Sequence, residues 1–345
     1  MADAAVRLAL RVVLLALIAG AGYLVKVSLP GEVPGALAPF PDEETWTTPS
    51  AQPGVVLSPR GPKIVVPKSL QLVPQSVQLR VTTANIQGGL SWNAAAGDLS
   101  RVMSADTDIV GINETSPERA VQLHGFAASR GWDAYTAPTQ PSIFRAQNAV
   151  LWNAARFSKI QAGSEFGSPS ITPQYKIDSR WITWVMLRHR SSGQIVSFVQ
   201  THMDPGSLKG RHVLSRAVID ANAQYQKRLL QLCRQLARRG VVVVGGDWNV
   251  DANANRHVAD PALPFTMLEG RGRGPLLSTY SVLGLPQLPT HMGGPVWIDY
   301  LAVWSTASPR LPRLTITGQH VGQGQRSDHR PLTAEVRMDY LVTRR

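Results

Sequence analysis

The part of the chain that follows residue 77 alternates between short runs of β-type residues and longer amphipathic segments. Short runs rich in β-branched and aromatic residues are typical of strands, whereas apolar residues spaced three and four positions apart are typical of helices. The pattern predicts helices at residues 92–105, 118–130 and 212–239, the last of them ending at Gly240. It predicts strands at residues 78–84, 109–112, 149–152, 181–188, 195–200, 241–244, 300–304 and 332–337.

Strands and helices in this succession favour an α/β (α+β) fold in which sheet layers are covered by helices. A sheet that is parallel throughout is disfavoured. Residues 181–188 and 195–200 are separated by a short polar stretch that contains Gly193, which predicts an antiparallel hairpin.

The N-terminus has a different pattern. Arg7 and Arg11 precede an uncharged apolar run at residues 12–25, which is short for a spanning helix unless residues 8–10 extend it. Ala19, Gly20 and Ala21 also offer a signal for cleavage. We therefore expect residues 1–27 to be a signal peptide or a membrane anchor, so that the protein is exported and is either secreted or attached to the cell membrane through residues 8–25.

The segment at residues 28–77 contains ten of the chain's 25 prolines and has almost no helical or alternating pattern. Such a composition is typical of an extended spacer. We therefore expect a proline-rich linker at residues 28–77 and one catalytic domain at residues 78–340.

The charge balance adds a preference for acidic partners. Lys and Arg total 35 against 23 Asp and Glu, which gives a net charge of +12 and attracts polyanions or acidic membranes. The single cysteine, Cys233, excludes an intramolecular disulfide and a metal site built from thiolates. Since Cys233 lies among leucines at helical spacing, it is predicted to be a core residue.

Polar side chains that can carry chemistry stand at the end of nearly every predicted strand. Taken singly, each has an ordinary explanation: Asn85 or Glu114 could be a cap, and His202 a hydrogen-bonded structural histidine. Their coincidence at strand ends indicates that they converge at one mouth of the fold. The set consists of Asn85, Glu114, His202, Asp247, Asn249, Asp299, Asp328 and His329.

With these motifs the chain resembles the endonuclease/exonuclease/phosphatase superfamily, and within it the deoxyribonuclease I-like branch, over about residues 78–338. The resemblance implies a four-layer sandwich of two mixed β-sheets flanked by helices, with Mg²⁺ or Mn²⁺ at one end of the sheets. It also implies that Asn148 and Arg180 contact the substrate. Gln87 stands where the branch that repairs abasic sites usually has an acidic residue, which disfavours that activity.

The residue types fit this chemistry. A hard cation needs oxygen ligands, which Glu114 and the amide of Asn85 can supply, while Asp328 could bind a second ion or tune the first.

Asp247 is placed to orient and deprotonate an attacking water, and Asn249 to donate a hydrogen bond to that water or to the phosphorus centre. His329, held by Asp299, can be cationic and stabilise phosphoryl oxygens or donate a proton. His202 then serves as a further acid or phosphate donor on the leaving-group side.

The sequence therefore predicts a metal-dependent phosphoric ester hydrolase, foremost a nuclease that cleaves DNA or RNA by attack of an activated water on phosphorus. Its partner is nucleic acid or another phosphodiester, and no protein partner is implied. The basic residues of the segment at 212–239 are better explained as a solvated helix face than as a DNA contact.

Two alternatives stay open. A lipid phosphodiesterase or phosphoinositide phosphatase would suit a membrane anchor, with Trp181 and Trp184 exposed. A binding module without activity is disfavoured because both histidines and all the acidic positions are present.

Overall fold

The computed structural model of the chain describes residues 71–344 apart from 105, 139–146, 172–178 and 306–311. The expected signal peptide or anchor at residues 1–27 and most of the expected linker lie outside the described residues. Within the described ranges, no helix combines the length and the apolar character needed to span a membrane.

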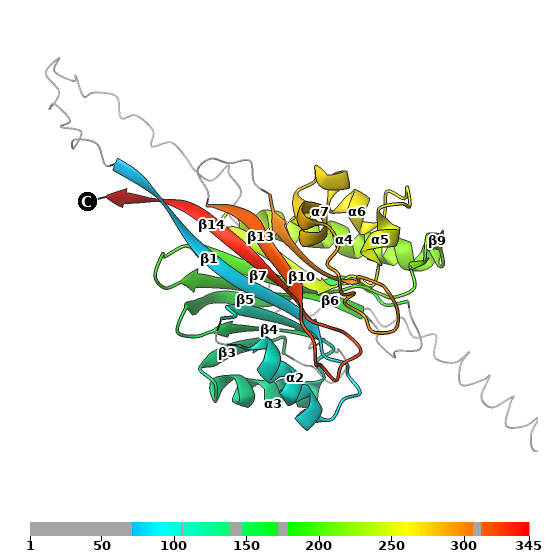
Figure 1. The fold of residues 1–345 in the computed structure, drawn as a ribbon, viewed down its shortest axis with the longest axis horizontal. Helices are drawn as coiled ribbons and strands as arrows, with labels where there is room; N and C mark the ends of the chain where they lie inside the picture. The colour runs from blue at the N-terminus through cyan, green and yellow to red at the C-terminus, as the bar shows by residue number, and fades with distance from the viewer. Residues whose placement is uncertain (1–70, 105, 139–146, 172–178, 306–311, 345) are drawn as a thin grey trace, which may run out of the picture. The chain divides into compact units, whose positions relative to one another are not determined.

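Two six-stranded sheets form the centre of the fold (Figure 1). Each sheet contains one parallel pair, β1–β2 or β7–β10, and its other neighbouring strands are antiparallel, so both sheets are mixed, as predicted. The first sheet has the order β13 (Arg313–Val321), β14 (Leu332–Arg344), β1 (Gln71–Asn85), β2 (Ile109–Asn113), β4 (Asn148–Asn153) and β3 (Trp132–Thr136). The second has the order β11 (Leu276–Ser278), β12 (Asp299–Trp304), β10 (Val241–Asp247), β7 (Ile195–His202), β6 (Ser179–His189) and β5 (Phe157–Pro169).

Helices cover the outer faces of both sheets. In Figure 1, α2 (Trp92–Val102) and α3 (Pro117–Ala128) lie against the first sheet, and α4 (Arg216–Ala237) lies against the second. The predicted four-layer sandwich is therefore confirmed. The remaining elements are α5 (Ala252–Asn255), α6 (Pro264–Met267), η3 (Gly270–Gly272), α7 (Thr279–Leu283) and the ribbon of β8 (Leu208–Lys209) and β9 (His212–Val213).

The alternation of side chains along the strands divides the core into layers. Ile109 of β2 packs between the two sheets, whereas Val110 and Ile112 pack under α2 and α3. Because both faces are covered, β2 and β10 are buried along their whole length. This explains the uninterrupted run of four valines at residues 241–244.

Burial also decides three predictions about single residues. Cys233 lies in the core beside the leucines of α4, as predicted. Trp181 and Trp184 are buried, so the expectation that they are exposed was wrong. Their strand, β6, packs on α4 and on β4 of the first sheet, which leaves neither tryptophan for a membrane surface.

Two of the element boundaries that differ from the sequence pattern have a clear physical cause. Strand β1 begins at Gln71, inside the expected linker, because it pairs with the far end of β14. Pro74 is tolerated there because β2 pairs with β1 only from Val81 onward, so among the described residues no strand pairs with that edge of β1 at Pro74. Helix α4 begins at Arg216 and not at 212, since Ser215 caps it by accepting a hydrogen bond from the backbone N–H of Val218.

Candidate active site

The strand directions bring the polar strand ends to one edge of the sandwich. The parallel pair β1–β2 ends at Asn85 and just before Glu114, and the parallel pair β7–β10 ends at His202 and Asp247. Strand β12 is antiparallel to β10 and begins with Asp299 directly opposite Asp247. The convergence that the sequence predicted is therefore a consequence of two parallel pairs and their antiparallel neighbours.

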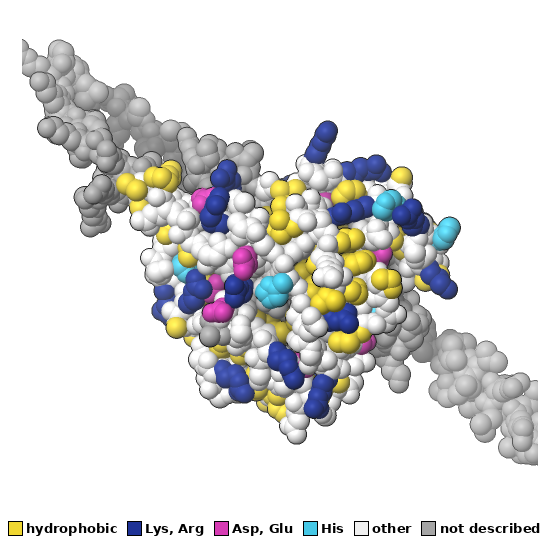
Figure 2. Space-filling model, in the orientation of Figure 1, with side chains coloured by type: hydrophobic (Ala, Val, Ile, Leu, Met, Phe, Trp, Pro, Cys, Tyr) yellow, Lys and Arg dark blue, Asp and Glu magenta, His cyan; other side chains and the backbone are white. Residues whose placement is uncertain are grey.

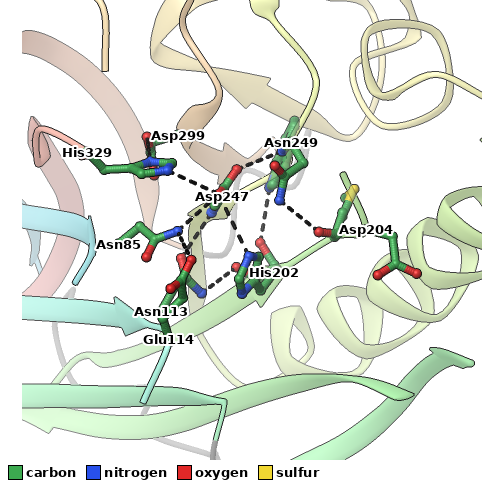
Figure 3. Close-up of polar contacts among 12 residues, drawn as sticks. Asn85, Asn113, Glu114, His202, Asp204, Asp247, Asn249, Asp299 and His329 are labelled. Atoms are coloured by element: carbon green, nitrogen blue, oxygen red, sulfur yellow. Dashed lines mark hydrogen bonds and ion pairs between the residues drawn. The ribbon is translucent and has the colours of Figure 1, made fainter. Parts of the chain in front are cut away.

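Asp247 is the centre of the site (Figure 3). One of its carboxylate oxygens, Oδ2, accepts a hydrogen bond from Nδ2 of Asn85 at 3.1 Å. Oδ2 also lies 3.7 Å from Nε2 of His202 and 3.9 Å from Nε2 of His329. Burial, followed by the nearby carboxylate of Asp299, raises the pKa of Asp247 to about 7. Asp247 can therefore exchange a proton near neutral pH.

His329 and Asp299 form the pair that the sequence predicted. Nδ1 of His329 donates to Oδ2 of Asp299 at 2.9 Å, and both side chains are buried. Burial alone would lower the pKa of His329, but the carboxylates of Asp299, Asp247 and Asp328 raise it to about 10. The imidazole is therefore cationic at neutral pH.

His202 has the opposite charge state. Burial and the neighbouring cations Arg180 and His329 lower the pKa of His202 well below its usual range. A neutral imidazole has no extra proton to give, so of the two roles predicted for His202, the geometry favours a hydrogen-bond donor over a general acid.

Asn85 and Glu114 lie in contact, as expected for a shared cation. Nδ2 of Asn85 donates to Oε1 of Glu114 at 3.0 Å, while Oε2 of Glu114 accepts from the backbone N–H of Gly88 at 2.7 Å. Oδ1 of Asn85 is buried and has no hydrogen-bond partner among the described residues. An orphaned oxygen beside a carboxylate fits a hard divalent cation.

Two further site residues lie near these ligands. Asp328, the third predicted ligand, belongs to a group with His291 and His329 whose ligand atoms lie within 4.8 Å of one another. Asn249 donates its backbone N–H to Asp247 at 2.7 Å and its amide to the carbonyl of Met203 at 2.9 Å.

The backbone at Glu114 and Asn249 is left-handed, with φ of 61° and 53°. Such conformations are uncommon for residues other than glycine, and they concentrate at functional sites. Here the left-handed conformation sets the direction of a polar side chain just after a buried strand: Glu114 follows β2, and Asn249 comes two residues after the end of β10.

Most of these side chains line a cavity of about 450 Å³: Glu114, His202, Asp247, Asn249, Asp328 and His329. Arg180, predicted to contact the substrate, lines it; its Nε donates to Asp204 at 2.6 Å, and its buried Nη1 has no hydrogen-bond partner within the described ranges. Asn148 does not reach the cavity. It is fully buried, donates to the carbonyl of Trp181 and accepts from Asn113, so the predicted substrate contact was wrong for this residue.

The family model described as the Endonuclease/Exonuclease/phosphatase family matches residues 82–345. The chain belongs to this family. It is a phosphoric ester hydrolase, a class that includes nucleases and phosphatases, as the sequence predicted. No curated protein sequence is significantly similar to the chain.

Solved structures share the fold. An endonuclease/exonuclease/phosphatase from Bacteroides vulgatus is 16% identical, covers 75% of this chain and 98% of its own, and has a TM-score of 0.57. D. rerio TDP2 complexed with single-strand DNA product is 14% identical, with coverages of 75% and 98% and a TM-score of 0.54. A Bacteroides thetaiotaomicron mannosyl-6-phosphatase is 16% identical, with coverages of 75% and 99% and a TM-score of 0.52.

The sequence pattern did not single out several residues that position this phosphoesterase site. Asn113 accepts hydrogen bonds from Gln200 and from the backbone N–H of Asp247, and it donates to the carbonyl of Thr201. It therefore ties the two sheets together directly below the site. A polar residue at the end of an apolar strand, one position before Glu114, was the available signal.

Arg119 organises the segments that follow β1 and β2. Its guanidinium donates to five backbone carbonyls, which belong to Ile86, Gln87, Gly88, Leu90 and Glu114. Burial lowers the pKa of Arg119. No local pattern marks this arginine, because its partners lie on other elements.

Asp98 and His291 were also missed. The carboxylate of Asp98, in α2, accepts from the backbone N–H groups of Arg326 and Ser327, and so holds the loop that carries Asp328 and His329. His291 lines the cavity beside His329.

Proposed function

We propose that the enzyme is a divalent-metal-dependent phosphodiesterase that cleaves nucleic acid by attack of an activated water on phosphorus. The observation that carries this proposal is the arrangement around Asp247: a carboxylate with a pKa of about 7 lies within 4 Å of two imidazoles, one neutral and one cationic. A carboxylate that can act as a base beside a fixed cation suits the activation of water and the neutralisation of a phosphoryl group.

In this proposal Asp247 takes the proton of the attacking water. The backbone N–H of Asn249 and the amide of Asn85 both donate to Asp247, and they fix the direction of its oxygens. A base with a pKa near the working pH removes a proton most efficiently, because it combines sufficient basicity with a substantial ionised fraction.

Two hydrogen-bond donors with fixed positions can stabilise the negative charge that develops on the phosphoryl oxygens. His329 is oriented and held cationic by Asp299, so it needs no rearrangement to donate a hydrogen bond. Arg180 adds a second fixed cation at the cavity wall, and its free Nη1 can donate to a phosphate oxygen.

Glu114 and Asn85 would hold the cation with their side-chain oxygens, and Asp328, which lines the same cavity as Glu114, could add a further carboxylate. A bound Mg²⁺ or Mn²⁺ supplies Lewis-acid stabilisation of phosphoryl oxygens. The protein residues supply the proton transfers and the orientation.

Nucleic acid is favoured as the substrate by charge. The chain carries a net charge of +12, and Figure 2 shows basic side chains spread over the visible face with few acidic ones among them. D. rerio TDP2, which shares the fold, has been solved with a single-strand DNA product. Arg234, Arg238 and Arg239 do not contribute, because they precede β10 and so lie at the end of that strand remote from Asp247.

The lipid alternative has lost one of its supports, since Trp181 and Trp184 are buried. An assay decides between the substrates. The protein with Mg²⁺ is offered single-strand DNA, plasmid DNA, RNA, sphingomyelin and a phosphoinositide, with Asp247→Asn as the inactive control. Cleavage of a nucleic acid by the wild type alone supports the proposal, and cleavage of a lipid alone contradicts it.

We also propose that residues 8–25 export the enzyme and attach it to a membrane unless they are cleaved off. The support is the apolar run between Arg11 and Lys26. The test is cell fractionation with N-terminal sequencing. Recovery in the membrane fraction, or in the medium without the first residues, supports export, and an intact chain in the cytoplasm contradicts it.

A further inference from the structure

His291 is held in place at the cavity wall by backbone pairing and by a ring contact. Its backbone forms β-bridges with Val296 and with His329. Its ring meets the ring of His329 edge-on, with centroids 4.9 Å apart and planes at 82°. The neighbouring Met292 donates its backbone N–H to the carbonyl of Asp328. The loop that carries His291 is thus fastened to the loop that carries His329.

The ring also has a defined tautomer. The backbone N–H of Gly293 donates to Nδ1 of His291 at 3.1 Å. A nitrogen that accepts a hydrogen bond carries no proton, so the proton of the neutral ring is on Nε2. Nε2–H is therefore a donor, while Nδ1 is used inside the loop.

Glycine is required at 293 for this arrangement. A Cβ on Gly293 would lie 2.6 Å from Cε1 and 3.0 Å from Nδ1 of His291, which is too close for the ring to keep its position. Gly294, the next residue, has no atom within 4 Å of the corresponding Cβ position. The position of the His291 ring therefore requires glycine at 293 but not at the adjacent position 294.

We propose that His291 is a further substrate-contacting residue of the proposed phosphodiesterase, whose Nε2–H donates a hydrogen bond to a phosphoryl oxygen bound beside His329. The inference rests on the proposed function. The ring lines the same cavity as His329 and Arg180, and the two cations draw a phosphoryl group into this cavity. A neutral donor beside them adds a hydrogen bond without adding charge repulsion to the cationic His329.

The alternative role for His291 is metal ligation, because ligand atoms of His291, Asp328 and His329 lie close enough together to hold one cation. The tautomer argues for the donor. A metal at Nε2 would have to replace the proton that the Gly293 contact places there. Ligation of a metal by His291 is therefore an outcome that would contradict the proposal.

Two substitutions distinguish donation from packing. His291→Gln keeps an N–H donor and loses the ring, whereas His291→Phe keeps the ring and loses the donor. If His291 donates to the substrate, the Phe variant loses about 10-fold to 100-fold in kcat/KM, as expected for one hydrogen bond to a charged oxygen, and the Gln variant retains more activity. Retention of activity by Phe with a loss in Gln would mean that the ring only packs against His329.

The two glycines supply a matched pair. Gly293→Ala should reduce kcat/KM about as much as His291→Phe, because the new methyl group displaces the ring, and Gly294→Ala should leave it unchanged. Combining Gly293→Ala with His291→Phe should add little to the loss. Equal activity of the two alanine variants would overturn the inference.

A binding measurement keeps this inference separate from the proposed function. In protein labelled with ¹⁵N-histidine, the His291 resonances, assigned by their absence in His291→Phe, should report a proton on Nε2. Inorganic phosphate added with Mg²⁺ should shift the Nε2–H signal. The inference is overturned if phosphate causes no shift. It is also overturned if Mn²⁺ alone broadens the His291 signals before those of every other histidine, because that would indicate metal ligation. Both outcomes count whether or not the enzyme cleaves nucleic acid.

Discussion

Nδ1 of His329 lies 2.9 Å from Oδ2 of Asp299, although the two residues are 30 positions apart in the sequence. The contact exists because Asp299 begins β12 and His329 precedes β14, and both strands run away from the same edge of the sandwich. The carboxylate orients the imidazole and favours its charged form.

The first prediction follows from this pair. Asp299→Asn should lower kcat/KM while the fold and metal binding stay intact, and His329→Ala should lower it by about 100-fold or more. The double mutant should be scarcely slower than His329→Ala, because both changes remove one function. If the activity losses of the two single variants multiply in the double mutant, Asp299 has a structural role. Unfolding of Asp299→Asn, measured by circular dichroism, would lead to the same conclusion.

The second prediction concerns pH. Asp247 acts as a base only when ionised, and its raised pKa of about 7 means that the active carboxylate is gained as the pH rises through that value. His329 acts only as a cation, and its raised pKa of about 10 means that the cation is lost as the pH rises through that value. The profile of kcat/KM should therefore rise and then fall, with its maximum between the two values.

A bound cation favours the carboxylate of Asp247, so it should move the rising limb to lower pH. His329→Gln should remove the falling limb and leave the rising one. If kcat/KM of His329→Gln still falls at alkaline pH, the falling limb of the profile belongs to a group other than His329.

The third prediction concerns the metal. Two oxygen ligands from the protein hold Mg²⁺ loosely, so EDTA should abolish hydrolysis, and Mg²⁺ or Mn²⁺ should restore it. Glu114→Gln should raise the Mg²⁺ concentration needed for half-maximal rate by about 10-fold or more. Glu335→Gln, on the outer side of β14, is the matched control and should leave that concentration unchanged. Full activity after thorough chelation would exclude the proposed use of Glu114 and Asn85.

The fourth prediction concerns Arg119. Lysine at this position cannot reach five carbonyls at once, so Arg119→Lys should leave buried acceptors unpaired and lower the free energy of unfolding by about 3 kcal/mol. Arg130→Lys, at the exposed end of the same helix, should change it little. Urea denaturation of the two variants measures the difference, and equal stability would mean that water replaces the missing bonds.

The sequence predicted those site residues whose position depends on local pattern. Asp247 follows a run of four valines and Glu114 follows β2, so each could be assigned to a strand end from its own neighbours. The direction of a side chain at a strand end depends on the opposite sheet, and for this reason Asn148 was wrongly assigned to the substrate.

Residues that act through distant partners could not be found in this way. Arg119 binds the loop after β1, about 30 positions away, and Asp98 binds the loop at Ser327, 229 positions away. The start of β1 at Gln71 likewise depends on pairing with the C-terminal strand. Local hydrophobic pattern contains none of this information.

In the proposed mechanism, water activated at Asp247 attacks phosphorus. Its most direct test is hydrolysis of bis(4-nitrophenyl) phosphate with Mg²⁺ in water enriched in oxygen-18, with mass spectrometry of both products. The label is expected in 4-nitrophenyl phosphate, and Asp247→Asn is expected to give neither product. Label in 4-nitrophenol, or undiminished hydrolysis by Asp247→Asn, would contradict it.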